Sequence, residues 1–268
     1  LMRRAMEYAS ALGVTLAQHC EDASLAAGGH MHEGEWSSRL GLAGQPAEAE
    51  ELMVMRDLAL ARLTGAQLHF LHLSTAGSLA MVRGAKASGL EVTAEVAPHH
   101  FTFTDAEVAS YDPVFKVNPP LRGEADVEAV KAALRDGSVD AIATDHAPHT
   151  QESKEAPFDQ APPGMLGLET ALALAMTELS LPVERVLALM SWQPAAIAGL
   201  GGEHGGPVAA GRPANLCVID PSEKWVVDAA CSASRSRNNP YVGRSLAGRV
   251  RHTVLRGQPI VVDTQAQR

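Results

Sequence analysis

The stretch Ala141-Ile142-Ala143-Thr144-Asp145-His146-Ala147-Pro148-His149 runs from a short apolar segment directly into a carboxylate and two imidazoles. The apolar part predicts a buried strand, and the polar part marks its carboxyl end. Three earlier apolar runs, at 14–20, 67–74 and 91–100, also end in polar residues, and a glycine closes the helical stretch before each of the four strands. Apolar strands that alternate with helices indicate a parallel βα sheet.

The polar residues at the strand ends favour a (β/α) barrel, because barrel active sites are built at the carboxyl ends of the strands. An open doubly wound sheet is the alternative, since its ligands also bind at that edge. No GxGxxG or Walker sequence follows any of the strands, which disfavours the open sheet. The pattern predicts helices at 1–12, 47–64, 76–88, 124–135, 169–179 and 183–192.

The sequence changes character near residue 205. Segments 211–220 and 250–262 predict short β-strands around turns, and the stretch 232–245 between them is polar and irregular. We therefore expect two domains, with residues 1–204 in the barrel and residues 205–268 in a small β satellite.

Composition excludes several classes of protein. Lys and Arg total 22 against 31 Asp and Glu, a formal charge of −9, whereas binders of nucleic acid or anionic membranes show a basic excess. No apolar stretch approaches the roughly 18 residues of a membrane span. Cys20, Cys217 and Cys231 are too few and too far apart for a disulfide framework. These features predict a cytoplasmic protein that binds neither nucleic acid nor membrane.

Three strand ends carry residues that bind metals. His19 ends the first strand, His72 the second and Asp145 the fourth. A lone histidine at a strand end is more often a hydrogen-bonded cap, but three such residues at equivalent positions of successive βα units reverse that interpretation. Imidazole and carboxylate together suit Zn²⁺ or a similar divalent ion. The sequence therefore predicts a metal site at this edge of the sheet.

Several other histidines and Cys20 are not expected to bind the metal ion. We expect His30-Met31-His32 to be part of a glycine-rich loop rather than a metal site, and Cys20 to fill space at its strand end. His69 is expected to face the helices. His146 is expected to support the metal site without binding the ion.

Two segments are candidates for substrate binding. Two prolines stiffen Lys116-Val117-Asn118-Pro119-Pro120-Leu121-Arg122, which presents the amide of Asn118 or is a plain loop. Pro163-Gly164 brings backbone groups close to a ligand or is only a turn before a helix. The polar loop 151–160, after the fourth strand, is a candidate lid.

The chain resembles the dihydroorotases of the amidohydrolase superfamily, and specifically their bacterial class I type. The matching segments are 18–22, 38–46, 72–74, 95–100, 116–122, 144–149, 164–170 and 211–216. The resemblance implies an α/β fold, a TIM-like (β/α)8 barrel of the metallo-dependent hydrolase type, with its carboxyl-terminal half in this chain. It also implies that the satellite is a small β-sandwich.

Carried over by position, His19 and His72 match ligands of the second of two metal ions. Asp145 matches a ligand of the first ion and the catalytic acid/base. The positions that match substrate contacts are Asn118, His149, Pro163 and Gly164. The resemblance implies reversible cyclisation of N-carbamoyl-L-aspartate to L-dihydroorotate, in de novo pyrimidine biosynthesis. A metal-activated hydroxide would attack the ring amide, with two Zn²⁺ ions or other divalent ions per complete site.

The sequence departs from the family pattern in one respect. The His-x-His-x-Arg motif of the first barrel strand and the acidic residue that bridges the metals do not occur in these 268 residues, and Leu1 already lies within a helical pattern. We therefore expect the amino-terminal part of the family pattern to lie outside this chain. We also expect these residues alone to be inactive.

Two alternatives stay open. One is an allantoinase or hydantoinase type of cyclic amidohydrolase, and the other is a non-catalytic relative that binds aspartate transcarbamoylase. Besides the small-molecule substrate, the resemblance implies a homodimer and aspartate transcarbamoylase as partners.

Overall fold

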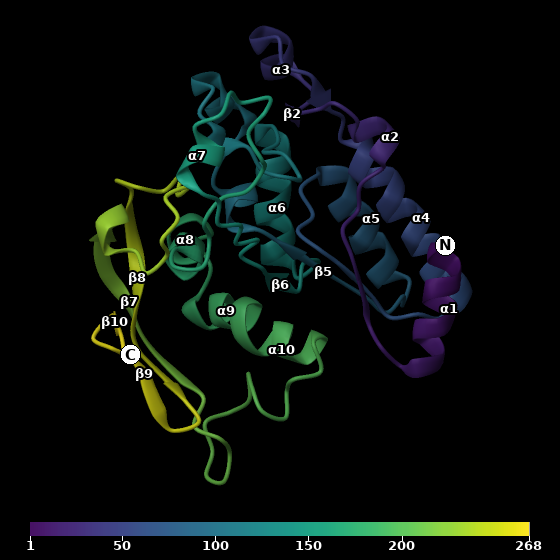
Figure 1. The fold of residues 1–268 in the computed structure, drawn as a ribbon. Helices are drawn as coiled ribbons and strands as arrows, with labels where there is room; N and C mark the ends of the chain where they lie inside the picture. Colours follow the sequence, from purple (N-terminus) through teal and green to yellow (C-terminus); the bar gives the residue numbers. More distant parts are fainter. Residues whose placement is uncertain (268) are drawn as a thin grey trace.

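The first sheet of the molecule is parallel. The computed structural model describes residues 1–267 and orders its strands β1-β4-β5-β6 (Figure 1). Their bounds are Leu16–Gln18, Leu68–Phe70, Val92–Val96 and Ala141–Ile142. Each strand neighbours the next in the chain order of the four, which confirms the predicted βα sheet.

Four long helices cover the sheet on one side. They are α1 (Met2–Leu12), α4 (Glu48–Thr64), α5 (Ala76–Ala87) and α6 (Glu124–Asp136). Leu68 and Phe70 of β4 are buried against Leu79 and Val82 of α5 in one continuous apolar core. The predicted helices 1–12, 47–64, 76–88 and 124–135 are therefore confirmed, because their apolar faces have this core to cover.

The segment between β1 and α4 is more ordered than an irregular loop. It contains α2 (Ala23–Ala26), β2 (Met31–His32), α3 (Glu35–Leu40) and β3 (Gly44–Gln45), and β2 pairs in parallel with β3. The expectation that residues 30–32 lie in a loop is corrected to this extent. Such short elements leave no periodic pattern in the sequence.

Short turns follow β5 and β6 at the carboxyl edge of the sheet. Three 3₁₀ turns, η1 (Pro98–Phe101), η2 (Asp105–Ser110) and η3 (Pro113–Phe115), lead to the segment around Asn118, and α7 (Gln151–Lys154) follows β6. Then come α8 (Ala171–Glu178), α9 (Val183–Leu187), the π-helical turn η4 (Ala188–Trp192) and α10 (Gln193–Ile197). The predicted helix 183–192 thus extends to residue 197.

A second sheet is antiparallel, in the order β10-β9-β8-β7. Its strands are β7 (Leu216–Val226), β8 (Ser245–Leu255), β9 (Gln258–Val262) and β10 (Gln265–Ala266), and η5 (Ala229–Cys231) follows β7. Figure 1 shows this sheet beside α8, at the carboxyl-terminal end of the colour scale. The predicted strands near 211–220 and 250–262 correspond to β7 and to parts of β8 and β9. The domain boundary between residues 204 and 205 stays a prediction.

The two sheets are joined through α8. Arg244 and Glu178 form an ion pair of 2.6 Å, and the amide of Ala247 donates to Thr177 Oγ1 at 2.9 Å. No helix among residues 1–267 has the length and apolarity that a membrane crossing requires.

Candidate active site

Two of the predicted metal ligands meet at the carboxyl edge of the parallel sheet. His19 follows β1 and His72 follows β4, and these strands are hydrogen-bonded neighbours. Nδ1 of His19 lies 3.1 Å from Nε2 of His72, and the two rings meet edge to face. The predicted convergence of these two side chains is therefore seen in the structure.

The histidine pair fits a divalent ion. Two nitrogen ligands of one tetrahedral ion, each about 2.0–2.1 Å from it, lie about 3.3 Å apart. Burial lowers the pKa of His72, which favours the neutral imidazole that coordinates metals. Among residues 1–267, no group of three or more His, Cys, Asp or Glu side chains is arranged to hold an ion. The structure thus brings the two histidines together and does not gather Asp145 with them into one such group.

Asp145 follows β6 at the same edge. Burial raises the pKa of its carboxyl, while the charges of His72 and His19 act to lower it. Nε2 of His99 lies 3.9 Å from Oδ2 of Asp145, and this nitrogen is buried without a hydrogen-bond partner. A carboxyl placed beside imidazoles at this edge has the geometry that proton transfer requires.

The backbone is strained at both strand ends. His72 has a φ of 31° and Asp145 a φ of 45°, which place both residues in the left-handed region. Non-glycine residues in this region are uncommon and cluster at functional sites. The two positions predicted from the sequence are therefore also exceptional in conformation.

Three predicted substrate contacts lie together after β6. Nε2 of His149 donates to the carbonyl of Pro163 at 2.9 Å. Gly164 has a φ of 138°, and a Cβ on it would lie 2.6 Å from Cβ of Ala147 and 2.7 Å from Nε2 of His149. Only glycine fits this turn. We refer to His149, Pro163 and Gly164 as the site turn.

Asn118 is linked to the histidine pair by a residue that sequence reasoning missed. Its Nδ2 donates to Oε2 of Glu21 at 2.7 Å, and the same carboxylate oxygen lies 3.5 Å from Nε2 of His19. Oδ1 of Asn118 is buried without a partner. The position of Glu21, two residues after His19 at the strand end, is the signal that could have identified it.

Asn238 is a second missed residue. It is buried, and its Nδ2 donates to the carbonyls of Ala147 at 2.8 Å and Gly164 at 3.1 Å. Its Oδ1 accepts from the amide of His149 at 3.2 Å. Asn238 comes from the polar stretch 232–245, where nothing in the local sequence distinguishes it.

The remaining candidates have structural roles. Cys20 is buried in the core, as expected. Nδ1 of His146 accepts from the amides of Gly167 and Leu168, which places it in a turn next to Asp145. Nδ1 of His32 lies 3.2 Å from the guanidinium of Arg122.

The prediction for His69 was wrong. Its ring nitrogens bond Thr93 Oγ1 at 2.8 Å and Glu95 Oε2 at 3.0 Å, on the opposite side of the sheet from the apolar core. Leu68 and Phe70 take the helix-facing positions of β4, so alternation turns His69 the other way.

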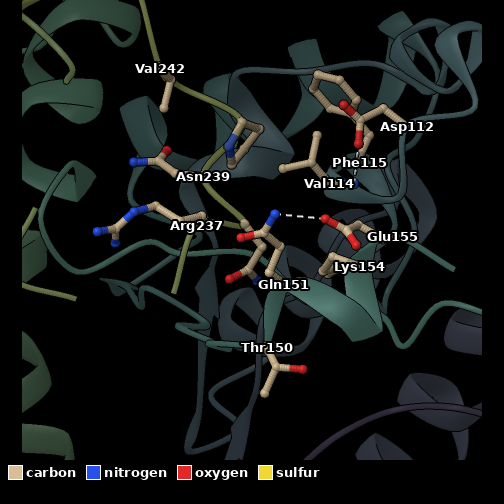
Figure 2. Close-up of a pocket in the computed structure, with 12 residues that line it drawn as sticks. Asp112, Val114, Phe115, Thr150, Gln151, Lys154, Glu155, Arg237, Asn239 and Val242 are labelled. Carbon is tan, nitrogen blue, oxygen red and sulfur yellow. Dashed lines mark hydrogen bonds between the residues drawn. The ribbon is translucent and has the colours of Figure 1, made fainter. Parts of the chain in front are cut away.

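A pocket of about 410 Å³ opens beside the site turn. Figure 2 shows Gln151, Lys154 and Glu155, from α7 and the residue after it, opposite η3 residues such as Phe115. Arg237 and the residues that follow it close another side. The loop predicted as a candidate lid thus forms one wall of this pocket.

Comparison with known proteins relates the chain to amidohydrolases. The model of the amidohydrolase family matches residues 1–260. The dihydroorotase of Streptomyces coelicolor is 51% identical over 267 residues, which is 98% of this chain and 62% of that protein. The dihydroorotase of Pelotomaculum thermopropionicum is 50% identical over 268 residues, with the same coverage.

Solved structures confirm the fold. The L-hydantoinase of Arthrobacter aurescens superposes with a TM-score of 0.88 at 26% identity, over all of this chain and 61% of that one. The D-hydantoinase of Thermus sp. gives a TM-score of 0.86, also at 26% identity, over 99% of this chain and 61% of that one. The architecture is therefore the TIM-like metallo-dependent hydrolase fold.

The chain spans about 62% of the length of the curated relatives it matches. The resemblance to dihydroorotases is confirmed by this similarity, and the family implies dependence on a divalent metal ion. From its matched residues, its fold and its paired histidines, the chain belongs to the amidohydrolase family.

Proposed function

We propose that the protein containing this chain is a dihydroorotase, which interconverts N-carbamoyl-L-aspartate and L-dihydroorotate in de novo pyrimidine biosynthesis. The similarity to dihydroorotases near 50% identity supports the substrate. The observation that carries the proposal is the His19–His72 pair at the strand ends, which lies on the same sheet edge as Asp145.

We propose Zn²⁺ as the ion, two per complete site, with His19 and His72 as ligands of one ion and Asp145 as a ligand of the other. A bound Zn²⁺ supplies Lewis acidity, which polarises an amide carbonyl and makes water a better nucleophile at neutral pH. The histidine pair, with its 3.1 Å separation, is the observation that favours such an ion over one with oxygen ligands only.

Each of the proposed site residues has a separate role in the reaction. Asp145 takes the proton from the attacking water and delivers it to the ring nitrogen, and it reverses this transfer in cyclisation. Asn118 presents its free Oδ1 to a substrate N–H. The carbonyls of Pro163 and Gly164 each keep a second lone pair for the ring, beyond the bonds they already accept.

The fold also supports a second candidate function. Hydantoinases share it with TM-scores of 0.86 and 0.88, so a cyclic amidohydrolase of the allantoinase or hydantoinase type remains an alternative substrate class. The relatives near 50% identity favour dihydroorotate over these rings.

The test is a comparison of kcat/KM on dihydroorotate, hydantoin, allantoin and dihydrouracil for the whole protein loaded with zinc. We expect dihydroorotate to be preferred, in both directions of the reaction. Preference for one of the other rings would favour the second candidate function instead. A protein that takes up no zinc and is inactive on all four rings would indicate a non-catalytic partner of aspartate transcarbamoylase.

We further propose a cytoplasmic homodimer that associates with aspartate transcarbamoylase. Mass measurement in solution, with and without that enzyme, tests both interactions.

A further inference from the structure

Lys116, which is buried, and Lys154, which is half-buried, bind backbone carbonyls beside the site turn. Lys116 lies just after η3, and its ammonium donates to the carbonyls of Phe158 at 2.7 Å and Asp159 at 3.0 Å. Only 7% of Lys116 is exposed. The side chain thus fastens the end of the 151–160 loop to the segment that leads to Asn118.

Lys154 makes the reciprocal connection. It lies at the end of α7, and its ammonium donates to the carbonyls of Pro113 at 2.8 Å and Pro162 at 2.9 Å. Figure 2 shows Lys154 on the wall of the pocket that faces Val114 and Phe115. Lys116 therefore binds two carbonyls of the 151–160 loop, and Lys154 binds one carbonyl of η3 and one carbonyl directly before Pro163. We call these four short bonds the lysine latch. Two longer contacts join Lys116 to Nδ1 of His30 at 3.4 Å and Lys154 to the carbonyl of Lys116 at 3.5 Å.

Ordinary charge pairing does not explain the latch. None of the ion pairs within the described part of the chain includes Lys116 or Lys154. Burial and the neighbouring charge of Lys116 lower the pKa of Lys154 to about 8. Two like charges placed close together and away from solvent are unfavourable. Anchoring the loop therefore does not by itself account for the presence of both lysines.

The latch lies next to residues proposed to bind substrate. Lys116 is two residues before Asn118, and Pro162 directly precedes the site turn residues Pro163 and Gly164. The carbonyl of Lys116 also accepts from the amide of Gly164 at 2.7 Å. Loosening the latch would therefore let Gly164 move relative to Asn118.

We propose that Lys116 and Lys154 are positioning residues that hold the site turn at a fixed distance from Asn118, and so determine how tightly the site binds its ring substrate. This inference rests on the proposed function for its kinetic consequence. Neither lysine takes part in proton transfer, so their loss affects binding of the ring more than its chemistry.

The experiment compares Lys154→Met, Lys154→Arg and the control Lys224→Met in the whole protein, Lys224 being an exposed lysine on β7. Amide hydrogen exchange of Gly164 is measured without substrate, and kcat and KM are measured separately on dihydroorotate. For Lys154→Met we expect exchange and KM each to rise about tenfold or more, because two bonds from a charged donor are lost. We expect kcat to change less, Lys154→Arg to recover most of the loss, and Lys224→Met to match the wild type.

Unchanged exchange and KM in Lys154→Met would overturn the proposal, as would a loss confined to kcat. If Lys154→Met does not fold, Lys154→Gln gives the same two readouts, since its shorter amide does not reach both carbonyls. If the wild type does not act on dihydroorotate, the proposed function fails, while the exchange of Gly164 still decides whether the latch holds the site turn.

Discussion

At the scale of single residues, His72 and Asp145 are two of the non-glycine residues with a left-handed backbone, and both follow strands of the parallel sheet. Each left-handed non-glycine residue costs about 1–3 kcal/mol and persists only where its surroundings hold it. After His72, the amides of Ser74 and Thr75 are bound by a carboxylate, and after Asp145 the ring of His146 accepts two amides. At these two positions the strained backbone coincides with residues proposed to bind an ion or to transfer a proton.

We predict that Asp145→Asn separates activity from stability. Asparagine tolerates the left-handed backbone and carries no buried charge, so the melting temperature should not fall. Without a proton acceptor, kcat should fall about 10²- to 10⁴-fold. The matched control is Asp263→Asn, because Asp263 has the same φ of 45° but is exposed at a turn of the second sheet. Normal turnover by Asp145→Asn would contradict the assigned role.

The sequence predicted the site residues that directly follow strands of the parallel sheet. It missed site residues contributed by segments distant in the chain. His19, His72 and Asp145 were identifiable because each comes after an apolar run. Asn238 was not, because it bonds His149 across 89 residues of chain and its own segment has no periodic pattern. Local patterns specify strand ends, whereas contacts between distant segments depend on the completed fold.

At the scale of elements, a buried carboxylate joins two helices and a loop. Glu50 of α4 accepts from the amides of Ser74 and Thr75, just before α5, each at 3.1 Å. Arg122 lies 3.9 Å from the same carboxylate and donates to Ser74 Oγ at 3.0 Å. The start of α5, the turn after His72 and the segment of Asn118 are thus held by one charge pair.

This arrangement predicts a dependence of stability on pH. Burial acts to raise the pKa of Glu50, but Arg122 and the bonds from Ser74 outweigh it, so the pKa lies below its ordinary value of 4.5. A depressed folded pKa means that the stabilisation is present above pH 4.5 and is lost as the pH falls through the folded value.

We expect Glu50→Gln to lose about 3 kcal/mol or more at pH 7, because Arg122 is left buried without its counter-charge. Its free energy of unfolding should then fall less than that of the wild type as the pH drops below 4.5. Urea unfolding across that range measures both effects. Glu48→Gln, an exposed position on the same helix, is the control. Parallel pH curves for wild type and Glu50→Gln would show that this carboxylate does not titrate as described.

Element prediction succeeded where helices were long. The helices α1, α4, α5 and α6 each repeat their apolar face over several turns. The π-helical turn at 188–192 and the paired strands β2 and β3 escaped prediction, because they depend on packing or on a partner segment.

At the scale of the whole molecule, the segment between β7 and β8 supports the site turn. Asn238 bonds the amide of His149 and the carbonyls of Ala147 and Gly164. The antiparallel sheet therefore does more than pack beside α8, because its connecting segment holds the turn that follows β6.

We predict that Asn238→Ala destabilises the protein by about 1–3 kcal/mol, since one buried and two half-buried backbone groups lose their side-chain partner. KM on dihydroorotate should rise with little change in metal content. Asn239→Ala is the control, because the side chain of Asn239 bonds only the nearby amide of Tyr241 in the described chain. Equal KM values for the two variants would show that the site turn does not depend on Asn238.

The bonds from Asn238 have a consequence for synthesis on the ribosome. Ala147 leaves the ribosome 91 residues before Asn238, a delay of roughly 5–18 seconds at about 5–20 residues per second. During that interval the turn with its buried carbonyls has no partner for them. The catalytic edge of a nascent chain is thus completed late, and slowing translation between these two codons should prolong its exposure to chaperones and proteases.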